Sequence, residues 1–430
     1  MEDQHHSLSS NERTYITSKP LMLKIAVHKK ESTGERDRKL MIPILVWGLA
    51  VIVIIPAVCR WTAPPPSAGK FVGYFVLAAS SAAICYYLYR RESLHLSRHQ
   101  SIVLVFLAFL LTCIANHIHG VNVDHGVSYF DKQSNVAWQE TTNDLVIQRS
   151  SSALPHSYRF LPNSIVRWMQ ISGLAYEQAR DLYRLIFGIL LFYAIYKYAR
   201  LYTNYLGAVI AMLLVAVVYP VSFEWSAGQL TDPLSHLSFV LAFIFLETED
   251  FALLLTTLLV GSLAKETVLA MTGYYVLFCR KERSYLRKAI TLCLASSGMY
   301  FGVRLLVLKG GMHYGQVSGV PLNQAWNHVW FNLRDPRWPR GFLLTVGAFV
   351  PFLVLAWEET PRSLKHQVLF LFPVLFISGI FFSFLREMRN LMPLVFVLVV
   401  IAASYLSGPL IEQFDRKRVA AGRHSFAPNS

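Results

Sequence analysis

Charge is scarce in this sequence. Only 15% of its 430 residues are charged, whereas 54% are hydrophobic and the mean hydropathy is +0.40. A soluble domain of this length has too large a surface to cover with so few charges. The apolar residues also form long uncharged runs instead of the short alternations of a soluble core. These features exclude a soluble globular class and predict a membrane protein.

Cysteine is also scarce, with five in the chain, and each of them lies in or beside an apolar run. This placement predicts no disulfide framework. The first residues lack the apolar stretch of a signal peptide. We therefore expect residues 1–39 to form a loosely ordered cytoplasmic tail, and the basic residues 408–430 to form another.

The formal net charge of +14 does not predict a nucleic-acid partner. The basic residues form short clusters that border apolar runs, at 36–39, 90–91, 280–288 and 416–418. Clusters in this position are typical of the cytoplasmic loops of membrane proteins. We predict that the chain is embedded in the bilayer and binds no nucleic acid.

Apolar runs of membrane-spanning length recur along residues 40–407. Crossing a hydrocarbon core of about 30 Å takes about 20 helical residues. The stretch 250–279 is longer and is interrupted by Lys265 and Glu266, which predicts two short helices with the charged pair at their outer turn. The other runs are 41–59, 70–89, 101–117, 182–199, 206–222, 233–247, 288–307, 341–357, 366–385 and 391–407. The prediction is an all-α polytopic bundle of about twelve spans.

The basic residues also set the predicted orientation. With the amino terminus inside, 24 of the 40 lysines and arginines fall on the inside and 16 on the outside. Both termini are then cytoplasmic, and the connection 118–181 after the third span is extracytoplasmic. Ile165, Trp168, Met169 and Ile171 follow near-helical spacing and predict a short interfacial helix within it. The basic tail and the lack of organellar signals favour a bacterial cytoplasmic membrane.

Five polar clusters fall on the predicted outer face, where charged residues at membrane depth often mark a site. They are His117–His125, Ser157–Pro162, Glu224–Pro233, Lys265–Thr267 and Arg386–Asn390. An ion pair at Lys265 and Glu266 is costly within an apolar stretch unless it faces water or protein. A turn alone could use Gly or Asn, so this cluster favours a function.

Three of the clusters also have a plainer reading. Asp232 followed by Pro233 is a typical helix start, with Asp as the N-cap. Arg386 and Arg389 could anchor helix ends at the membrane interface. Histidines at 117, 119 and 125, together with Asp124, offer metal-binding atoms, but their spacing matches no closed zinc pattern. We predict no protein metal site.

Taken in order, five segments resemble the GT-C superfamily, the multi-spanning glycosyltransferases that use polyprenyl-phosphate sugars. The resemblance runs from about Asp124 to Leu406 and is best between Ala179 and Lys281. Its segments are "SYRFLP" (157–162), "ARDLYRLIFGILLFYAIYKYARLY" (179–202), "LTDPLSHLSFVLAFIFLE" (230–247), "LVGSLAKETVLAMTGYYVLF" (259–278) and "REMRNLMPLVFVL" (386–398). In one departure from the family, two extra spans precede the first outer loop. The loop acid that matches is Asp124, and Asp131 is its rival.

The resemblance implies a lipid-linked sugar donor and a glycan or lipid acceptor of the cell envelope. Asp124 would be the base for the acceptor hydroxyl, and direct attack would invert the anomeric centre. The leaving phosphate would be stabilised by cations, namely Arg159, Lys265, Arg386 and Arg389. The acceptor would be bound, or the site supported, by Asp232, Glu266 and Asp131. Some relatives bind the phosphate through a divalent cation, so the cofactor stays open.

Three other functions are compatible with the sequence. One is a polysaccharide polymerase or ligase of the same pathway, whose outer arginines would recognise a lipid pyrophosphate. Another is a secondary transporter or lipid flippase, which predicts charged residues near the bilayer midplane and broken helices there. Here most of the candidates lie at span ends on one side, which disfavours that reading. The third is a non-catalytic membrane scaffold.

Overall fold

The computed structural model describes residues 98–124, 132–150, 156–222, 230–280, 284–307 and 325–424. Within these ranges all regular structure is helical, which confirms the all-α prediction for this part of the chain. The predicted tail 1–39 and the predicted spans 41–59 and 70–89 lie outside the described residues.

Five helical segments are long and apolar enough to cross a membrane, as the composition predicts. They are Tyr176–Ala199, Tyr205–Ser222, Arg337–Ala356, Arg362–Phe381 and Met388–Gly408. The total of twelve spans stays a prediction, because two of the twelve fall outside the described ranges.

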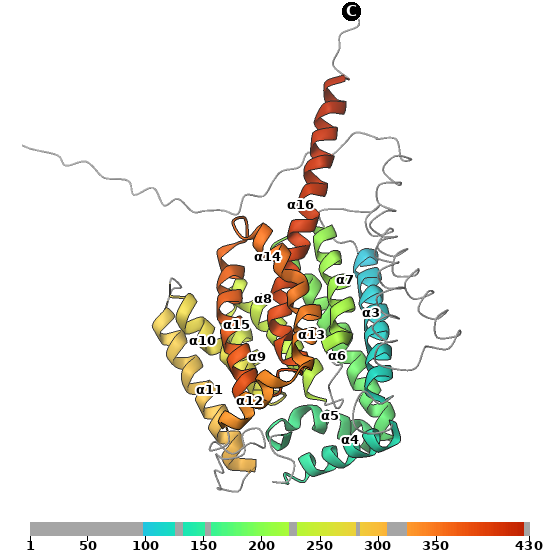
Figure 1. The fold of residues 1–430 in the computed structure, drawn as a ribbon, viewed down its shortest axis with the longest axis vertical. Coiled ribbons are helices and arrows are strands. Elements are labelled where there is room, and N and C mark those ends of the chain that lie inside the picture. Colours follow the sequence, from blue (N-terminus) through green and yellow to red (C-terminus); the bar gives the residue numbers. More distant parts are fainter. Residues whose placement is uncertain are drawn as a thin grey trace, which may run out of the picture. The chain divides into compact units, whose positions relative to one another are not determined.

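The long helices form one bundle (Figure 1), in which α8 packs against α6, α9 (Phe251–Ser262) and α16. These long helices are α3 (Arg98–Asp124), α6 (Tyr176–Ala199), α7 (Tyr205–Ser222), α8 (Thr231–Glu247), α11 (Tyr285–Val307), α15 (Arg362–Phe382) and α16 (Met392–His424). Most residues of α8 are buried, as expected for a helix that is apolar on all sides. The helix α16 continues to His424, so the predicted tail 408–430 begins inside a helix.

Two of the long apolar stretches are divided into shorter helices, one as predicted and one not. The stretch 250–279 forms α9 (Phe251–Ser262), the short 3-10 helix η3 (Glu266–Leu269) and α10 (Ala270–Phe278), so the predicted break at Lys265 is present. A second break, which the sequence did not predict, divides α13 (Arg337–Thr345) from η6 (Gly347–Phe349) and α14 (Val350–Ala356).

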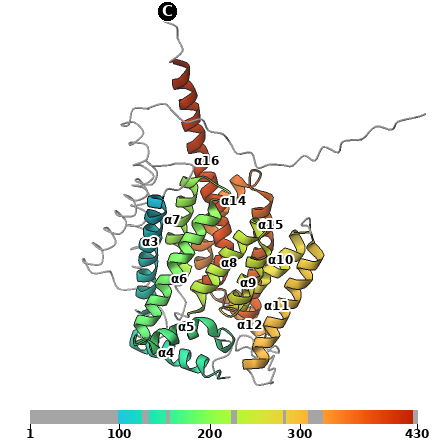
Figure 2. The same ribbon diagram turned by 180° about the vertical axis from the view of Figure 1, so that it is seen from behind.

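Short helices lie across one end of the bundle, here called the site end (Figures 1 and 2). They are α4 (Lys132–Ile147), η2 (His156–Tyr158) and α5 (Phe160–Ile171). The predicted interfacial helix is part of α5, in which Val166 is buried while Trp168 and Ile171 are exposed. Neither α4 nor α12 (Ala325–Arg334) was predicted, because both are short and partly polar.

Candidate functional site

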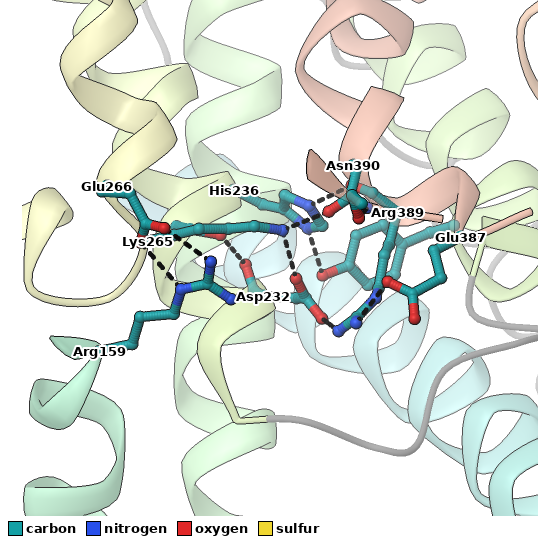
Figure 3. A network of polar contacts seen from close by, with 11 residues as sticks. Arg159, Asp232, His236, Lys265, Glu266, Glu387, Arg389 and Asn390 are labelled. Carbon is teal, nitrogen blue, oxygen red and sulfur yellow. Dashed lines mark hydrogen bonds and ion pairs between the residues drawn. The ribbon is translucent and has the colours of Figure 1, made fainter. Parts of the chain in front are cut away.

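Three interruptions of the bundle meet near the start of α5, at the site end (Figure 3). They are the first turn of α8, the junction of α9 with η3, and the segment around η7 (Met388–Leu391) that precedes α16. Six charged side chains from these segments and from the start of α5 form ion pairs: Arg159, Asp232, Lys265, Glu266, Glu387 and Arg389. We call this set the charged network.

Local packing brings these segments together. A Cβ atom added at Gly261 would lie 2.6 Å from the Cβ of Ser238, so glycine allows α9 to approach α8 closely just before the break. The backbone N–H of Leu161 then donates to the carbonyl of Leu263 at 3.2 Å. This bond fixes the start of α5, and with it Arg159, against the junction that carries Glu266.

The end of α15 is capped by a side chain from another helix. The amide nitrogen of Asn332 in α12 donates to the carbonyls of Gly379, Ile380 and Ser383 at 3.2, 2.9 and 2.8 Å. Its oxygen accepts from the backbone N–H of Leu385 at 3.1 Å. The cap satisfies carbonyls that a helix end leaves unpaired, and it directs the chain into η7.

Asp232 lies at the centre of the charged network. Its Oδ1 is 3.2 Å from the Nζ of Lys265, and its Oδ2 is 2.6 Å from Nη1 of Arg389. The side chain is fully buried, and two cations around one carboxylate favour its ionised form. The N-cap of α8 is Leu230, so the plainer reading of Asp232 as the N-cap is wrong.

Arg159 and Glu266 form a bidentate ion pair at the edge of the network. The Nε and Nη2 atoms of Arg159 donate to Oε2 and Oε1 of Glu266 at 2.9 and 2.7 Å. Burial by itself would raise the pKa of Glu266, but Arg159 outweighs it and lowers the pKa to about 2. Glu266 is therefore ionised at neutral pH.

Lys265 pairs with a different partner from its neighbour Glu266. Besides Asp232, its Nζ donates to Oδ1 of Asn390 at 2.7 Å. Burial lowers the pKa of Lys265, and the attraction of Asp232 offsets only part of that shift. The ammonium therefore depends on the carboxylate beside it for its charge.

Arg389 joins the network to the core. Its Nη2 donates to Oε2 of Glu387 at 2.8 Å, and its carbonyl lies 3.0 Å from Nε2 of His236. His236 also contacts the hydroxyl of Tyr219 at 3.1 Å through Nδ1. Arg389 is buried, so the interpretation as an exposed interfacial anchor is wrong for this residue.

Arg386 lies outside the charged network. Its Nη1 is 3.4 Å from Oδ2 of Asp335. The same carboxylate accepts from Arg337, at Oδ1 from Nε at 2.7 Å and at Oδ2 from Nη2 at 2.9 Å. Burial raises the pKa of Asp335, but its hydrogen bonds with Arg337 dominate and lower it. The structure therefore separates Arg386 from the other three predicted phosphate-binding cations.

The structure does not describe the side chains of the two candidate loop acids, Asp124 and Asp131. Asp124 is the last residue of α3, but its side chain is not among the described ones, and Asp131 lies wholly outside the described residues. Their assignment as the base stays a prediction. Within the described ranges, no group of three His, Cys, Asp or Glu side chains could hold a metal ion. The oxygens of Asp232 and Glu266 already accept from cations, so these residues do not fit a divalent cation.

Sequence reasoning missed three members of the site: His236, Glu387 and Asn390. His236 follows Asp232 by four residues and so shares its helix face, a signal that the sequence contained. Glu387 and Asn390 flank residues that were predicted, but only the folded chain orients them toward Arg389 and Lys265.

The described chain is thus an all-α protein with apolar helices of membrane-spanning length and a buried charged network at one end. No protein-family model, curated protein or solved structure matches it.

Proposed function

We propose that the chain is a membrane glycosyltransferase of the GT-C type. It moves a sugar from a polyprenyl-phosphate donor to a cell-envelope glycan or lipid on the extracytoplasmic face of a bacterial cytoplasmic membrane. The observation that carries the proposal is the charged network. Asp232, Lys265 and Arg389 are buried, and the other three charged side chains are half-buried. Taking these charges out of water contributes little net stability, because desolvation offsets their attraction. Such groups in a membrane protein commonly serve a function.

The cations of the network have N–H groups that could bind the phosphate of a lipid-linked sugar. A lipid phosphate gains negative charge as the glycosidic bond breaks, and preorganised cations stabilise that charge best in a site with little water. Arg159 has five N–H donors and uses two on Glu266. Lys265 has three N–H donors and uses two, on Asp232 and Asn390. The remaining donors would bind phosphate oxygens, while the carboxylates hold the cations in place.

The proposed base is Asp124, with Asp131 as the rival. Asp232 is unsuited to this role, because two cations stabilise its ionised form and weaken it as a proton acceptor. Asp232 and Glu266 are instead positioning residues that orient Lys265, Arg389 and Arg159. With direct attack by the acceptor, the product has the inverted anomeric configuration.

A polymerase or ligase remains the second candidate, since the same cations could bind a lipid pyrophosphate. A transporter or flippase is less well supported. It predicts charged residues and broken helices near the middle of the spans, whereas this network lies at the site end of the bundle, at the first turn of α8 and the start of α5.

The test is mass spectrometry of lipid-linked and surface glycans from a deletion strain of the source bacterium. Complementation uses wild type, Asp124→Asn and Lys265→Met, with Arg167→Met on the exposed face of α5 as a control. We expect one defined sugar to be lost and then restored by wild type and Arg167→Met only. Accumulated single repeat units would indicate the polymerase instead. Transfer at the wild-type rate by Asp124→Asn would exclude Asp124 as the base.

A further inference from the structure

A small cavity of about 20 Å³ opens beside the charged network, between α4, η2 and the first turn of α8. Gln139, Thr231, His156 and Trp138 are among the residues that line it. Thr231 precedes Asp232 directly, and His156 lies three residues before Arg159. The cavity therefore adjoins the cations proposed to bind the donor phosphate.

Two buried polar atoms at this cavity lack a hydrogen-bond partner among the described residues. They are Nε2 of Gln139 and Oγ1 of Thr231, whose residues are 4% and 2% exposed. The amide of Gln139 is oriented by its other atom, since Oε1 accepts from Nη1 of Arg180 at 3.2 Å. An unpaired buried donor costs about 1–3 kcal/mol, so these atoms indicate a polar occupant.

The described lining of the cavity is uncharged. Burial, followed by the repulsion of Arg159 and Arg389, lowers the pKa of His156 to about 3, so its imidazole is neutral at pH 7. A phosphate would find no cation within the cavity, and a cationic group would be repelled by the same arginines. The chemistry of the lining therefore fits a neutral hydroxyl, which can accept from Gln139 and bond to Thr231.

Size limits what can enter. A cavity of about 20 Å³ holds one water molecule or one hydroxyl group, and not a sugar ring. The ring would stay at the rim, where Trp138 is 38% exposed and offers an aromatic surface. Aromatic surface together with a few fixed polar groups is typical of small-molecule sites.

We propose that the cavity is a hydroxyl subsite: one sugar hydroxyl of the substrate binds Gln139 and Thr231 while the ring rests against Trp138. This inference rests on the proposed function and deepens it, because it assigns the residues that would select the sugar. The subsite would hold the sugar next to the cations that bind its phosphate.

Binding of methyl glycosides to the purified protein tests the subsite. The probes are the methyl α- and β-glycosides of glucose, galactose, mannose and their N-acetylamino forms, followed by saturation-transfer NMR in a sugar-free zwitterionic detergent. We expect saturable binding of at least one glycoside to the wild type. Thr231→Val should weaken that binding about tenfold, the effect of one hydrogen bond.

Two further variants, Thr345→Val and Gln139→Glu, separate loss of binding from loss of folding. Thr231→Val removes a hydroxyl that lacks a partner in the described structure, so the protein should fold with unchanged or raised stability. Thr345→Val is the matched control, because Thr345 is also fully buried in a helix but lies away from the cavity. Gln139→Glu, which replaces the amide donor with an acceptor, should weaken glycoside binding as well.

Three outcomes would overturn the subsite. The first is no glycoside binding to the wild type at 100 mM, and the second is binding that Thr231→Val and Gln139→Glu leave unchanged. The third is a lower melting temperature for Thr231→Val with unchanged binding, which would make the cavity a structural water site. Glycoside binding without any change in the glycans of the deletion strain would refute the glycosyltransferase and leave the subsite standing.

Discussion

The two ends of α8 carry the same functional group in opposite surroundings. Asp232 lies in the first turn and pairs with Lys265 and Arg389. Glu247 is the last residue, and its Oε1 accepts from Nε2 of Gln367 at 3.3 Å. Gln367 in turn accepts from the hydroxyl of Tyr198. One carboxylate is surrounded by charge, and the other by neutral amide and phenol groups.

The helices around each end explain the difference. Near Asp232 the neighbouring segments are broken, at the α9–η3 junction and at η7, and the breaks carry Lys265 and Arg389. Near Glu247 the neighbours are the continuous helices α6 and α15, which present Tyr198 and Gln367. A buried carboxylate is therefore not enough to form an ion-pair network. The cations that pair with it lie on irregular backbone segments inside the bundle.

Removing a cation at the Asp232 end should have the largest effect. Arg389→Met leaves a buried carboxylate with one partner fewer, so we expect the free energy of unfolding to fall by about 3–5 kcal/mol. Unfolding of the purified protein by SDS in mixed micelles measures it. Adding Glu387→Gln should recover part of the loss, because Arg389 is the cation that compensates the charge of Glu387. A double variant no more stable than Arg389→Met would show that the ion pair is not the cause.

A smaller effect is expected at the Glu247 end. Gln367→Leu removes a neutral bridge between Tyr198 and Glu247, and the unsatisfied groups should cost about 1–3 kcal/mol in the same assay. The proposed glycosyl transfer should persist, since this cluster lies at the opposite end of α8. The proposed difference between the two ends would be refuted if Gln367→Leu destabilised the protein more than Arg389→Met, or if it abolished the proposed transfer.

Lowering the pH should reduce the stability of the protein through two groups at the Asp232 end, His156 and Glu266. The pKa of His156 is lowered to about 3 from an ordinary value near 6.5, so the unfolded chain binds its proton more readily. This contribution to stability is thus complete above pH 6.5 and is lost as the pH falls below 6.5 toward 3. Glu266, whose pKa is lowered to about 2, adds a loss only below its ordinary value near 4.5.

The window between pH 6.5 and 4.5 therefore separates the contribution of His156 from that of Glu266. His156→Gln should make the dependence of the melting temperature on pH less steep in this window and keep the loss below it. An equal slope in wild type and variant would mean that some other group is titrating.

Span positions were readable from the sequence because hydropathy is a local property. The predicted run 206–222 corresponds to α7 (Tyr205–Ser222), and 233–247 corresponds to α8 (Thr231–Glu247). The break at Lys265 was also predicted, since two charges cannot lie within an apolar helix without a reason. The helices α4 and α12 were missed because short, partly polar segments carry no such signal.

Five of the six residues of the charged network were predicted from the sequence, but how they pair was not. Arg386 and Arg389 are three residues apart and would share a face in a helix, yet the chain between α15 and α16 is not α-helical there. Arg386 consequently turns to Asp335, and Arg389 turns to Asp232. The sequence alone could not divide the two arginines between different partners.

The sequence by itself determined which stretches are apolar, that the helix breaks at Lys265, and that cations and carboxylates lie near span ends. Only the tertiary structure decided which carboxylate meets which cation. The partners are 33, 107 and 157 residues apart for Lys265–Asp232, Arg159–Glu266 and Arg389–Asp232. Ion pairing depends on distances of a few ångströms in space, and those distances are set by how α8, α9 and η7 pack against one another.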